Sequence, residues 1–197
     1  MRENGLHADC FDFQTEVRRF MAEMDAGLCG GASTLQMAPT YLDTSADLPE
    51  DGDVVAVDAG GTNLRVALVR FRAGRPPEIV AKEKAPVPGS GIPVTLDEFF
   101  DRVVEQAGAL LDEGDRLGMC FSFPSEILPD KDARILLFNK ELRVAGAEGA
   151  LIGPSLNAAL ARAGKGPRRV TVLNDTAAAL LGELAMQQKR AYAGHIG

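Results

Sequence analysis

The clearest chemical signal in this chain is a short polar segment between two apolar runs. Residues 58–65 read Asp-Ala-Gly-Gly-Thr-Asn-Leu-Arg, and Val-rich runs precede them at 54–57 and follow them at 66–69. Apolar runs of this kind predict buried strands. The Gly60-Gly61 pair predicts a hairpin turn, because glycine tolerates the positive φ that tight hairpins need. With no Cβ in the way, backbone N–H groups at the turn can point at an anion such as phosphate.

The polar residues on either side of the glycines bear on two interpretations of this turn. A Gly-Gly pair alone is typical of a plain hairpin. Asp58 can hold a hydrated Mg²⁺, since that cation prefers oxygen ligands and keeps several waters. Further donors follow the glycines at Thr62, Asn63 and Arg65. The acid before the turn and the Thr and Arg after it therefore favour a phosphate-binding turn.

Other candidate residues stand where further predicted strands end. Asn174 and Asp175 lie where a strand passes into a helix, and ligand sites of open α/β sheets lie at the carboxyl ends of strands. By itself, an Asn-Asp-Thr sequence is more often a plain Asp or Thr N-cap. Ser122 ends an apolar strand that Pro124 stops, because proline cannot continue a ladder. Lys140 by itself is typical of a solvated surface lysine.

An N-terminal helix, followed by five strands and three helices in the order βββαβαβα, is predicted to position these residues. The predicted strands cover 54–57, 66–69, 78–85, 117–121 and 170–173. The predicted helices cover about 11–26, 95–111, 154–164 and 176–189. Thr95 with Glu98 three residues later is a capping box, and Lys and Glu alternation puts strand 78–85 nearer the sheet edge. Connectivity alone supports a mixed-sheet α/β fold.

Composition argues against several classes of function. The chain has 197 residues, a net charge of -7, 46% hydrophobic and 25% charged residues, typical of a soluble globular protein. The acidic balance argues against nucleic acid and anionic membrane as partners. We expect no signal peptide and no membrane span, because no apolar core or run of about 18 apolar residues occurs.

The cysteines and histidines suggest no metal centre. Cys10, Cys29 and Cys120 have no metal-ligand spacing, and Cys120 is interpreted as a small core residue in an apolar strand. His7 and His195 lie near the termini and suggest no catalytic or metal cluster. A reducing cytoplasm is the expected location.

Segment 58–65 matches D-x-G-G-T-x-x-R, the first phosphate motif of sugar kinases in the actin, Hsp70 and hexokinase superfamily. Other segments resemble, in order and approximate spacing, those of eukaryotic-type hexokinases. They are 37–42, Phe121-Ser122-Phe123-Pro124, Phe138-Asn139-Lys140, 146–149 and Asn174-Asp175-Thr176. From about Phe11 to its end, the chain therefore resembles the N-terminal small domain of a hexokinase.

The resemblance implies a ribonuclease-H-like, actin-like ATPase domain and phosphorylation of a glucose-like hexose at its 6-hydroxyl by Mg-ATP. It implies that Asp175 is the general base and that Lys140 stabilises the transferred phosphoryl group. The implied sugar-binding residues are Ser122, Phe123, Pro124, Asn139, Lys140, Asn174 and Asp175. The implied phosphate-binding residues are Asp58, Ala59, Gly60, Gly61, Thr62, Asn63 and Arg65, with Asp58 reaching the metal through water.

Two departures from the family pattern change what is expected of this chain. Phe138-Asn139 stands where the family shows Trp-Thr, and the longer Asn side chain is expected to alter the sugar preference. The chain ends at Gly197, before the second phosphate loop and adenosine pocket of the family. We therefore expect one domain, 1–197, with 1–46 as an N-terminal helical and lead-in segment, and with the large domain absent.

That expected absence has two consequences. The chain alone is expected to be inactive. Apolar surface that the large domain would cover is expected to allow self-association.

Two other functions stay open at this point. An actin- or Hsp70-like ATP-binding module without chemistry does not account for 121–124, Lys140 and 174–175 together. A non-catalytic sugar sensor related to hexokinases would keep the same sugar-binding residues, so the sequence does not separate it from a kinase.

Overall fold

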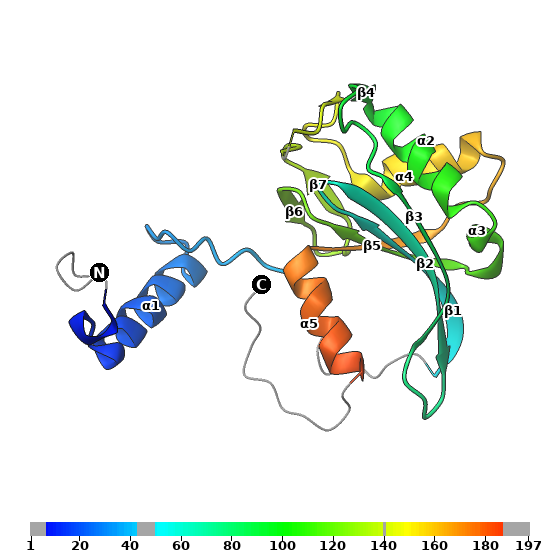
Figure 1. Ribbon diagram of the computed structural model, residues 1–197. Helices are drawn as coiled ribbons and strands as arrows, with labels where there is room; N and C mark the ends of the chain where they lie inside the picture. Colours follow the sequence, from blue (N-terminus) through cyan, green and yellow to red (C-terminus); the bar gives the residue numbers. More distant parts are fainter. Residues whose placement is uncertain (1–6, 43–49, 140, 187–197) are drawn as a thin grey trace. The chain divides into compact units, whose positions relative to one another are not determined.

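Residues 40–197 fold around a five-stranded sheet (Figure 1). The structure is a computed structural model, and it describes residues 7–42, 50–139 and 141–186. Residues 1–39 form a separate unit. The strands of the sheet, in chain order, are β1 (Asp51–Ala59), β2 (Asn63–Arg72), β3 (Glu78–Pro86), β5 (Arg116–Phe121) and β9 (Arg169–Leu173).

The sheet has the order β3-β2-β1-β5-β9. The first three strands form the predicted antiparallel meander, with β3 at the predicted edge position. β5 runs parallel to β1, and β9 runs parallel to β5. All five predicted strands are confirmed, each with somewhat longer bounds. Because three neighbouring strands are parallel, the carboxyl ends of β1, β5 and β9 lie at the same edge of the sheet.

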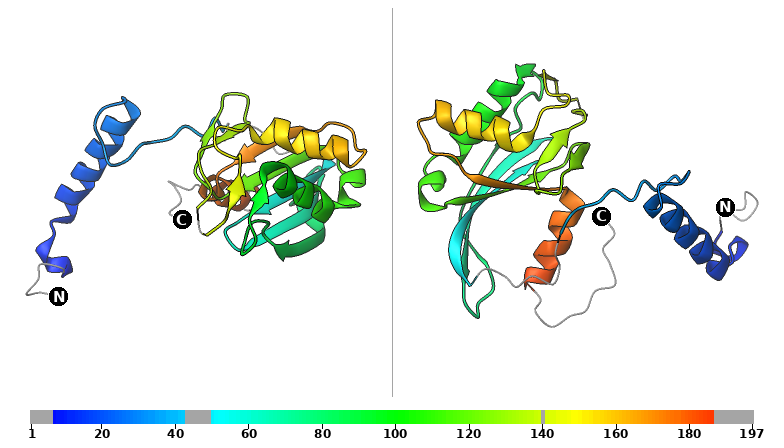
Figure 2. Two further views of the ribbon diagram at one scale, coloured as in Figure 1. Left: turned by 90° about the horizontal axis from the view of Figure 1, so that it is seen from above. Right: turned by 180° about the vertical axis from the view of Figure 1, so that it is seen from behind.

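Helices cover the two faces of this sheet unequally (Figure 2). The helices of this unit are α2 (Leu96–Ala107), α3 (Leu110–Glu113), α4 (Ile152–Arg162) and α5 (Asp175–Met186). α2 and α4 pack together on one face, and α5 lies on the other. Val55 and Val57 of β1 are buried in the core with α2 and α4. The alternate residues Ala56 and Asp58 face the side of α5 and are only partly covered.

The predicted helix over 95–111 is two helices. The Thr95 hydroxyl accepts the N–H of Glu98 at 3.2 Å, and the Glu98 carboxylate accepts the N–H of Thr95 at 2.7 Å, which confirms the capping box. Gly108 has a φ of 46° and ends α2. Glycine adopts this left-handed conformation without a Cβ clash. Leu111, the last residue of the predicted helix, therefore belongs to the separate helix α3.

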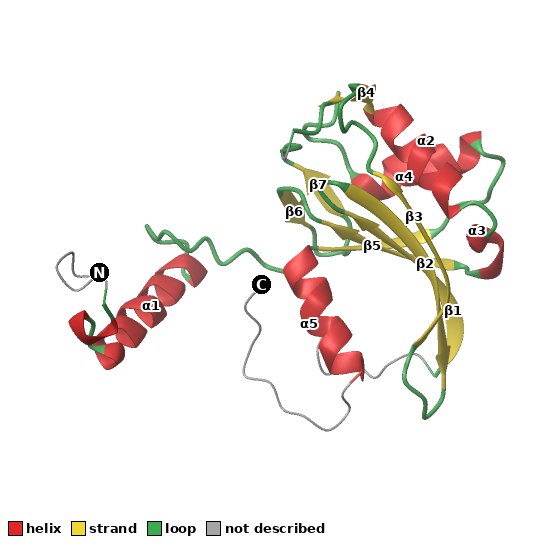
Figure 3. Cartoon of the chain, in the orientation of Figure 1, coloured by secondary structure: helices red, strands yellow, loops and turns green. Residues whose placement is uncertain are grey.

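Four short strands are absent from the sequence-based prediction. They are β4 (Val94–Thr95), β6 (Ser125–Ile127), β7 (Ala133–Ile135) and β8 (Val144–Ala145). β6 and β7 form a hairpin (Figure 3), and β4 pairs in parallel with β8. Runs of two or three residues carry too little alternation to be recognised. The predicted end of the last helix, 187–189, lies outside the described residues.

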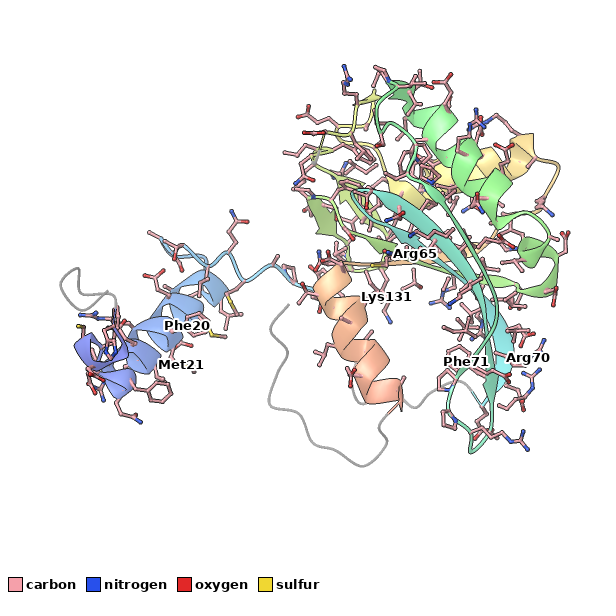
Figure 4. All side chains as sticks on the ribbon, viewed as in Figure 1. Phe20, Met21, Arg65, Arg70, Phe71 and Lys131 are labelled. Carbon is pink, nitrogen blue, oxygen red and sulfur yellow. The ribbon has the colours of Figure 1, made fainter. Side chains whose placement is uncertain are left out.

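The N-terminal unit contains a 3-10 turn at Ala8–Cys10 and the helix α1 (Phe13–Leu28), which confirms the helix predicted over 11–26. The Asp12 carboxylate caps α1 by accepting the N–H of Thr15 at 3.1 Å. The apolar side chains of α1 are exposed, among them Phe20 and Met21 (Figure 4). Exposed apolar side chains favour association, and the self-association expected above stays a prediction.

Candidate functional site

The turn between β1 and β2 spans residues 60–62. The N–H of Gly60 donates to the carbonyl oxygen of Asn63 at 3.0 Å, so the predicted hairpin is confirmed. The predicted positive φ at Gly60 and Gly61 is wrong, because the described glycines with positive φ lie elsewhere. Glycine tolerates a positive φ without requiring one, so the Gly-Gly pair predicts the turn but does not fix its backbone conformation.

Gly60 has room for a side chain as far as the rest of the chain is concerned. Among the described residues, an added Cβ would meet the Asn63 carbonyl oxygen at 3.4 Å and nothing else within 4 Å, which is an ordinary contact. Neither the backbone conformation nor internal packing therefore requires glycine at this position. The space that a Cβ would fill lies open beside the backbone, as close approach of an anion requires.

Asp58 lies between two partners in one row across the sheet. Its register partners are Arg65 on β2 and Cys120 on β5. Nη1 of Arg65 donates to Oδ2 of Asp58 at 2.6 Å, and the two side chains are 53% and 37% exposed. The carboxylate therefore sits on the partly open face of the sheet, where it can keep part of its hydration.

The Cys120 thiol connects Asp58 to the rest of the site. Burial is the main cause that raises the pKa of this thiol to about 12, and the nearby charge of Asp58 and a hydrogen bond to it contribute. The charge of Asp175 raises this pKa further, whereas a hydrogen bond with Ser122 lowers it. The thiol is therefore protonated at neutral pH and donates to Asp58. Because both carboxylates act on one thiol, Asp58 and Asp175 lie around Cys120.

Asp175 begins α5 directly after β9. Oδ1 of Asn174 accepts the N–H of Thr176 at 3.0 Å, and the Asn174 carbonyl accepts the N–H of Ala178 at 2.9 Å. The N-cap is thus Asn174 rather than Asp175 or Thr176. The exposed Asp175 carboxylate also accepts the Thr176 N–H, at 2.8 Å. It stands in the first helical turn, where the helix dipole stabilises a negative charge.

Ser122 and Phe123 follow β5 at the same edge of the sheet. The N–H of Ser122 donates to the carbonyl oxygen of Ala59 at 3.2 Å, so the end of β5 is tied to the residue before the glycine turn. Phe123 is 1% exposed, and its side chain belongs to the core. The half-buried Pro124 accepts the N–H of Leu136 at 3.0 Å through its carbonyl oxygen.

An aromatic cluster supports the second predicted sugar-binding segment. The ring centroid of Phe138 lies 4.8 Å from that of Phe123 and 5.6 Å from that of Phe121. Phe138 thus packs against the core and fixes the start of the segment that continues to Asn139. Asn139 is exposed, and its carbonyl oxygen accepts the N–H of Leu142 at 3.2 Å. Lys140 lies outside the described residues.

A cavity of about 560 Å³ opens on the face of the sheet that bears α5. Its lining includes Asp58, Arg65 and Cys120 together with Leu173 of β9 and Ala178 of α5. Asp58 and Arg65, on either side of the turn, therefore line the same concave surface as the first turns of α5 at Ala178.

The described residues contain neither a cluster of metal-ligating side chains nor a helix that could cross a membrane. In this part of the chain, no three His, Cys, Asp or Glu side chains are grouped so that they could hold a metal ion. None of the helices described here has the length and apolar character to cross a membrane.

The sequence model of the family described as Hexokinase matches residues 3–184 of this chain. The chain belongs to the hexokinase family. Hexokinase-1 of Oryza sativa subsp. japonica is 36% identical over 183 residues, which are 84% of this chain and 36% of that protein. Human hexokinase-3 is 32% identical over 177 residues, which are 85% of this chain and 18% of that protein.

A solved hexokinase has the same fold. The structure of hexokinase from Schistosoma mansoni complexed with glucose matches 81% of this chain and 37% of that chain, with a TM-score of 0.68 and 26% identity. The predicted actin-like sugar-kinase fold and the predicted family are therefore confirmed. The chain spans about a third of the length of the rice and Schizosaccharomyces pombe hexokinases that it matches, at 36% and 35%.

The sequence analysis missed the place of Cys120 in this site. It interpreted the residue as part of the core, whereas the structure puts its side chain beside Asp58 on the partly open face. The signal was available in the period of the strand. Leu117, Met119 and Phe121 alternate as buried residues of β5, so Cys120 has to point to the opposite face.

Proposed function

We propose that this chain is part of a hexokinase that transfers the γ-phosphoryl group of ATP to the 6-hydroxyl of a glucose-like hexose. One observation carries the proposal. Asp58, Ser122 and Asp175 stand at or just after the carboxyl ends of three neighbouring parallel strands, β1, β5 and β9. In the hexokinase pattern these residues belong to the phosphate turn, the sugar site and the catalytic base.

The proposed roles follow from the chemistry of each side chain. The Asp175 carboxylate accepts the proton of the attacking sugar hydroxyl, and its exposed position in the first turn of α5 leaves it reachable. Asn174, Ser122 and Asn139 hydrogen-bond sugar hydroxyls. In the proposal Lys140 lies near the transferred group, where a fixed positive charge stabilises the developing negative charge. Phosphoryl transfer depends mainly on this positioning and charge stabilisation.

The turn from Asp58 to Arg65 is proposed to hold the phosphates of Mg-ATP. Gly60 leaves space at the backbone, and Arg65 supplies a charged donor suited to phosphate oxygens. The donor set fits a hydrated magnesium ion, because Mg²⁺ usually takes one or two carboxylates and keeps waters and substrate phosphates as its other ligands. Asp58 would hold the ion through water, and the ion would neutralise charge on the phosphates.

A chimera tests the proposed function at full family length. Residues 3–184 of this chain replace the matching segment of rice hexokinase-1, and glucose 6-phosphate formation is followed with a coupled dehydrogenase. We expect turnover with Mg-ATP. Asp175→Asn should lower kcat by about 100-fold or more, with a much smaller effect on glucose affinity, because the lost interaction acts on the reacting hydroxyl.

Asp101→Asn is the matched control. Asp101 is a partly exposed carboxylate on α2, paired with Arg162 at 2.7 Å on the other face of the sheet, so its change should leave kcat unaltered. Near-full turnover of the Asp175→Asn chimera would exclude Asp175 as the base. Glucose binding without any turnover of the parent chimera would support a sugar-sensing protein instead.

A further inference from the structure

Two aspartate–arginine pairs join β1 and β2, and they differ in a way that bears on ligand binding. Asp58 pairs with Arg65 beside the glycine turn, and Asp53 pairs with Arg70 toward the other end of the same ladder. Figure 4 shows Arg65 and Arg70 at separate positions along β2. The two pairs have the same chemistry and the same antiparallel register, so each serves as a reference for the other.

The Asp53–Arg70 pair is closed. Nε of Arg70 lies 3.1 Å from each carboxylate oxygen, and Nη2 lies 2.7 Å from Oδ2. Nη1 of Arg72 adds a contact of 3.4 Å, and the Asp53 side chain is only 15% exposed. The hydrogen bond from Arg70 is the main cause that holds the pKa of Asp53 below its usual range. Several donors and low exposure indicate a structural ion pair.

The Asp58–Arg65 pair is open. One guanidinium nitrogen of Arg65 contacts one oxygen of Asp58, at 2.6 Å, and both side chains are more than a third exposed. Exposed ion pairs with a single contact add little stability. The arginine can therefore exchange this partner for a stronger one at small cost. A phosphate group is such a partner, because it presents several charged oxygens to the guanidinium fork.

The proposed function assigns both members of this open pair to ligands: Arg65 to phosphate and Asp58 to a hydrated metal ion. While Arg65 and Asp58 bind each other, the ion pair keeps Arg65 from phosphate and Asp58 from the hydrated metal ion. We propose that the Asp58–Arg65 ion pair is a latch that phosphate opens. The anion draws Arg65 away, and Asp58 is then exposed to the hydration shell of the cation. This inference rests on the proposed function, and it makes Arg65 a positioning residue for Asp58.

Cys120 keeps Asp58 in place when the latch opens. Cys120 is the register partner of Asp58 on β5, the strand on the other side of β1 from β2, so its uncharged thiol lies beside the carboxylate. A neutral donor holds the carboxylate without repelling an arriving cation. Coupling between the two ligands is reciprocal, so bound metal should also favour the phosphate-bound position of Arg65.

Nuclear magnetic resonance of the 197-residue protein tests the latch without any enzyme assay. Inorganic pyrophosphate is titrated in the absence of metal, while the Arg65 Nε–H signal and the Asp58 Cγ signal are followed. The latch requires both signals to move together. At saturation, the Asp58 Cγ shift should reach the value that it has in Arg65→Gln without pyrophosphate.

Manganese binding supplies a second measurement. Mn²⁺ is added without an anion, and its paramagnetic broadening of the amide signals of Gly60 and Gly61 measures occupancy beside Asp58. Arg65→Gln should bind Mn²⁺ about threefold more tightly than the natural sequence, since an exposed ion pair is worth only a small factor in affinity. Arg70→Gln, the matched control, should leave this affinity unchanged.

The outcomes separate the latch from the proposed function. Pyrophosphate binding at the turn with an unmoved Asp58 Cγ signal would overturn the latch and leave the phosphate-binding turn intact. Equal Mn²⁺ affinity of Arg65→Gln and the natural sequence would overturn it as well. If pyrophosphate moved no signal between residues 58 and 65, the phosphate role of the turn would fail, and the latch with it.

Discussion

Cys120 illustrates at the scale of one residue how the face of a strand determines side-chain chemistry. Met119 and Phe121, the residues directly before and after Cys120 in β5, are fully buried in the hydrophobic core. Cys120 instead shares the partly open face with Asp58, to which it donates. The result is a thiol that stays neutral because it is largely buried and because the neighbouring carboxylates disfavour a thiolate.

This environment predicts selective thiol labelling. With a pKa near 12, only about one Cys120 side chain in ten thousand is a thiolate at pH 8, and the thiolate is the nucleophile. In the native protein, iodoacetamide should modify the exposed Cys10 and Cys29 and leave Cys120 intact. Mass spectrometry after brief labelling counts the modified sites. Unfolding in urea should make all three react, and three equally fast sites in the native protein would contradict the prediction.

At the scale of elements, α2 connects a local sequence signal to the core. Thr95 and Glu98 satisfy each other's backbone N–H groups at its first turn. The helix then presents buried apolar residues to the sheet, among them Phe99, Phe100 and Val103. The cap fixes where the helix begins and therefore which of its faces meets the core.

Removal of the cap should destabilise the protein by about 1 kcal/mol, the usual cost when an N-cap Thr becomes Ala. Thr95→Ala leaves one N–H of the first turn without its partner and adds no new contact. Urea unfolding followed by circular dichroism measures the loss. Thr34→Ala serves as a control in the N-terminal unit, and its effect on the unfolding of residues 40–197 should be negligible.

The capping box also predicts a dependence of stability on pH. Hydrogen bonds from the N–H and then the hydroxyl of Thr95 lower the pKa of Glu98 in the folded state. A lowered folded pKa means that the contribution is fully present above the ordinary glutamate pKa and is lost as the pH falls through the lowered value. Glu98→Gln keeps an acceptor without titrating. The stability difference between the natural sequence and Glu98→Gln should therefore shift toward the variant on acidification, and a constant difference would contradict this.

At the scale of the whole molecule, the described residues of the candidate site would contact a transferred phosphoryl group from one side only. The turn, Ser122 and Asp175 gather at one edge of a single sheet. The chain itself spans about a third of the length of its rice relative, at 36%. Phosphoryl transfer needs charges and donors arranged around the whole transferred group.

We therefore expect no measurable hexokinase turnover from a protein made of residues 1–197 alone. The described residues supply the proposed phosphate-binding turn and the proposed base. The measurement is a coupled assay of the pure protein with glucose and Mg-ATP, with rice hexokinase-1 as the positive control. Turnover in the usual kinase range of roughly 1–100 s⁻¹ would show that this chain is catalytically sufficient.

Much of the fold could be predicted from sequence because its signals are local. The Val-rich runs on both sides of residues 58–65 predict the β1–β2 hairpin, and the alternation of charges in 78–85 predicts an edge strand. Thr95 and Glu98 predict the start of α2. The order of separate motifs indicates the family that the comparison confirms. Each signal depends on residues that are close in sequence, where spacing reports conformation directly.

Tertiary structure alone decided how these pieces combine. The order β1-β5-β9 places Asp58 beside a cysteine 62 positions later in the chain, and Asp175 near the same thiol. Strand order depends on packing between segments that are distant in sequence, so no local pattern encodes the neighbours of Cys120 or its raised thiol pKa.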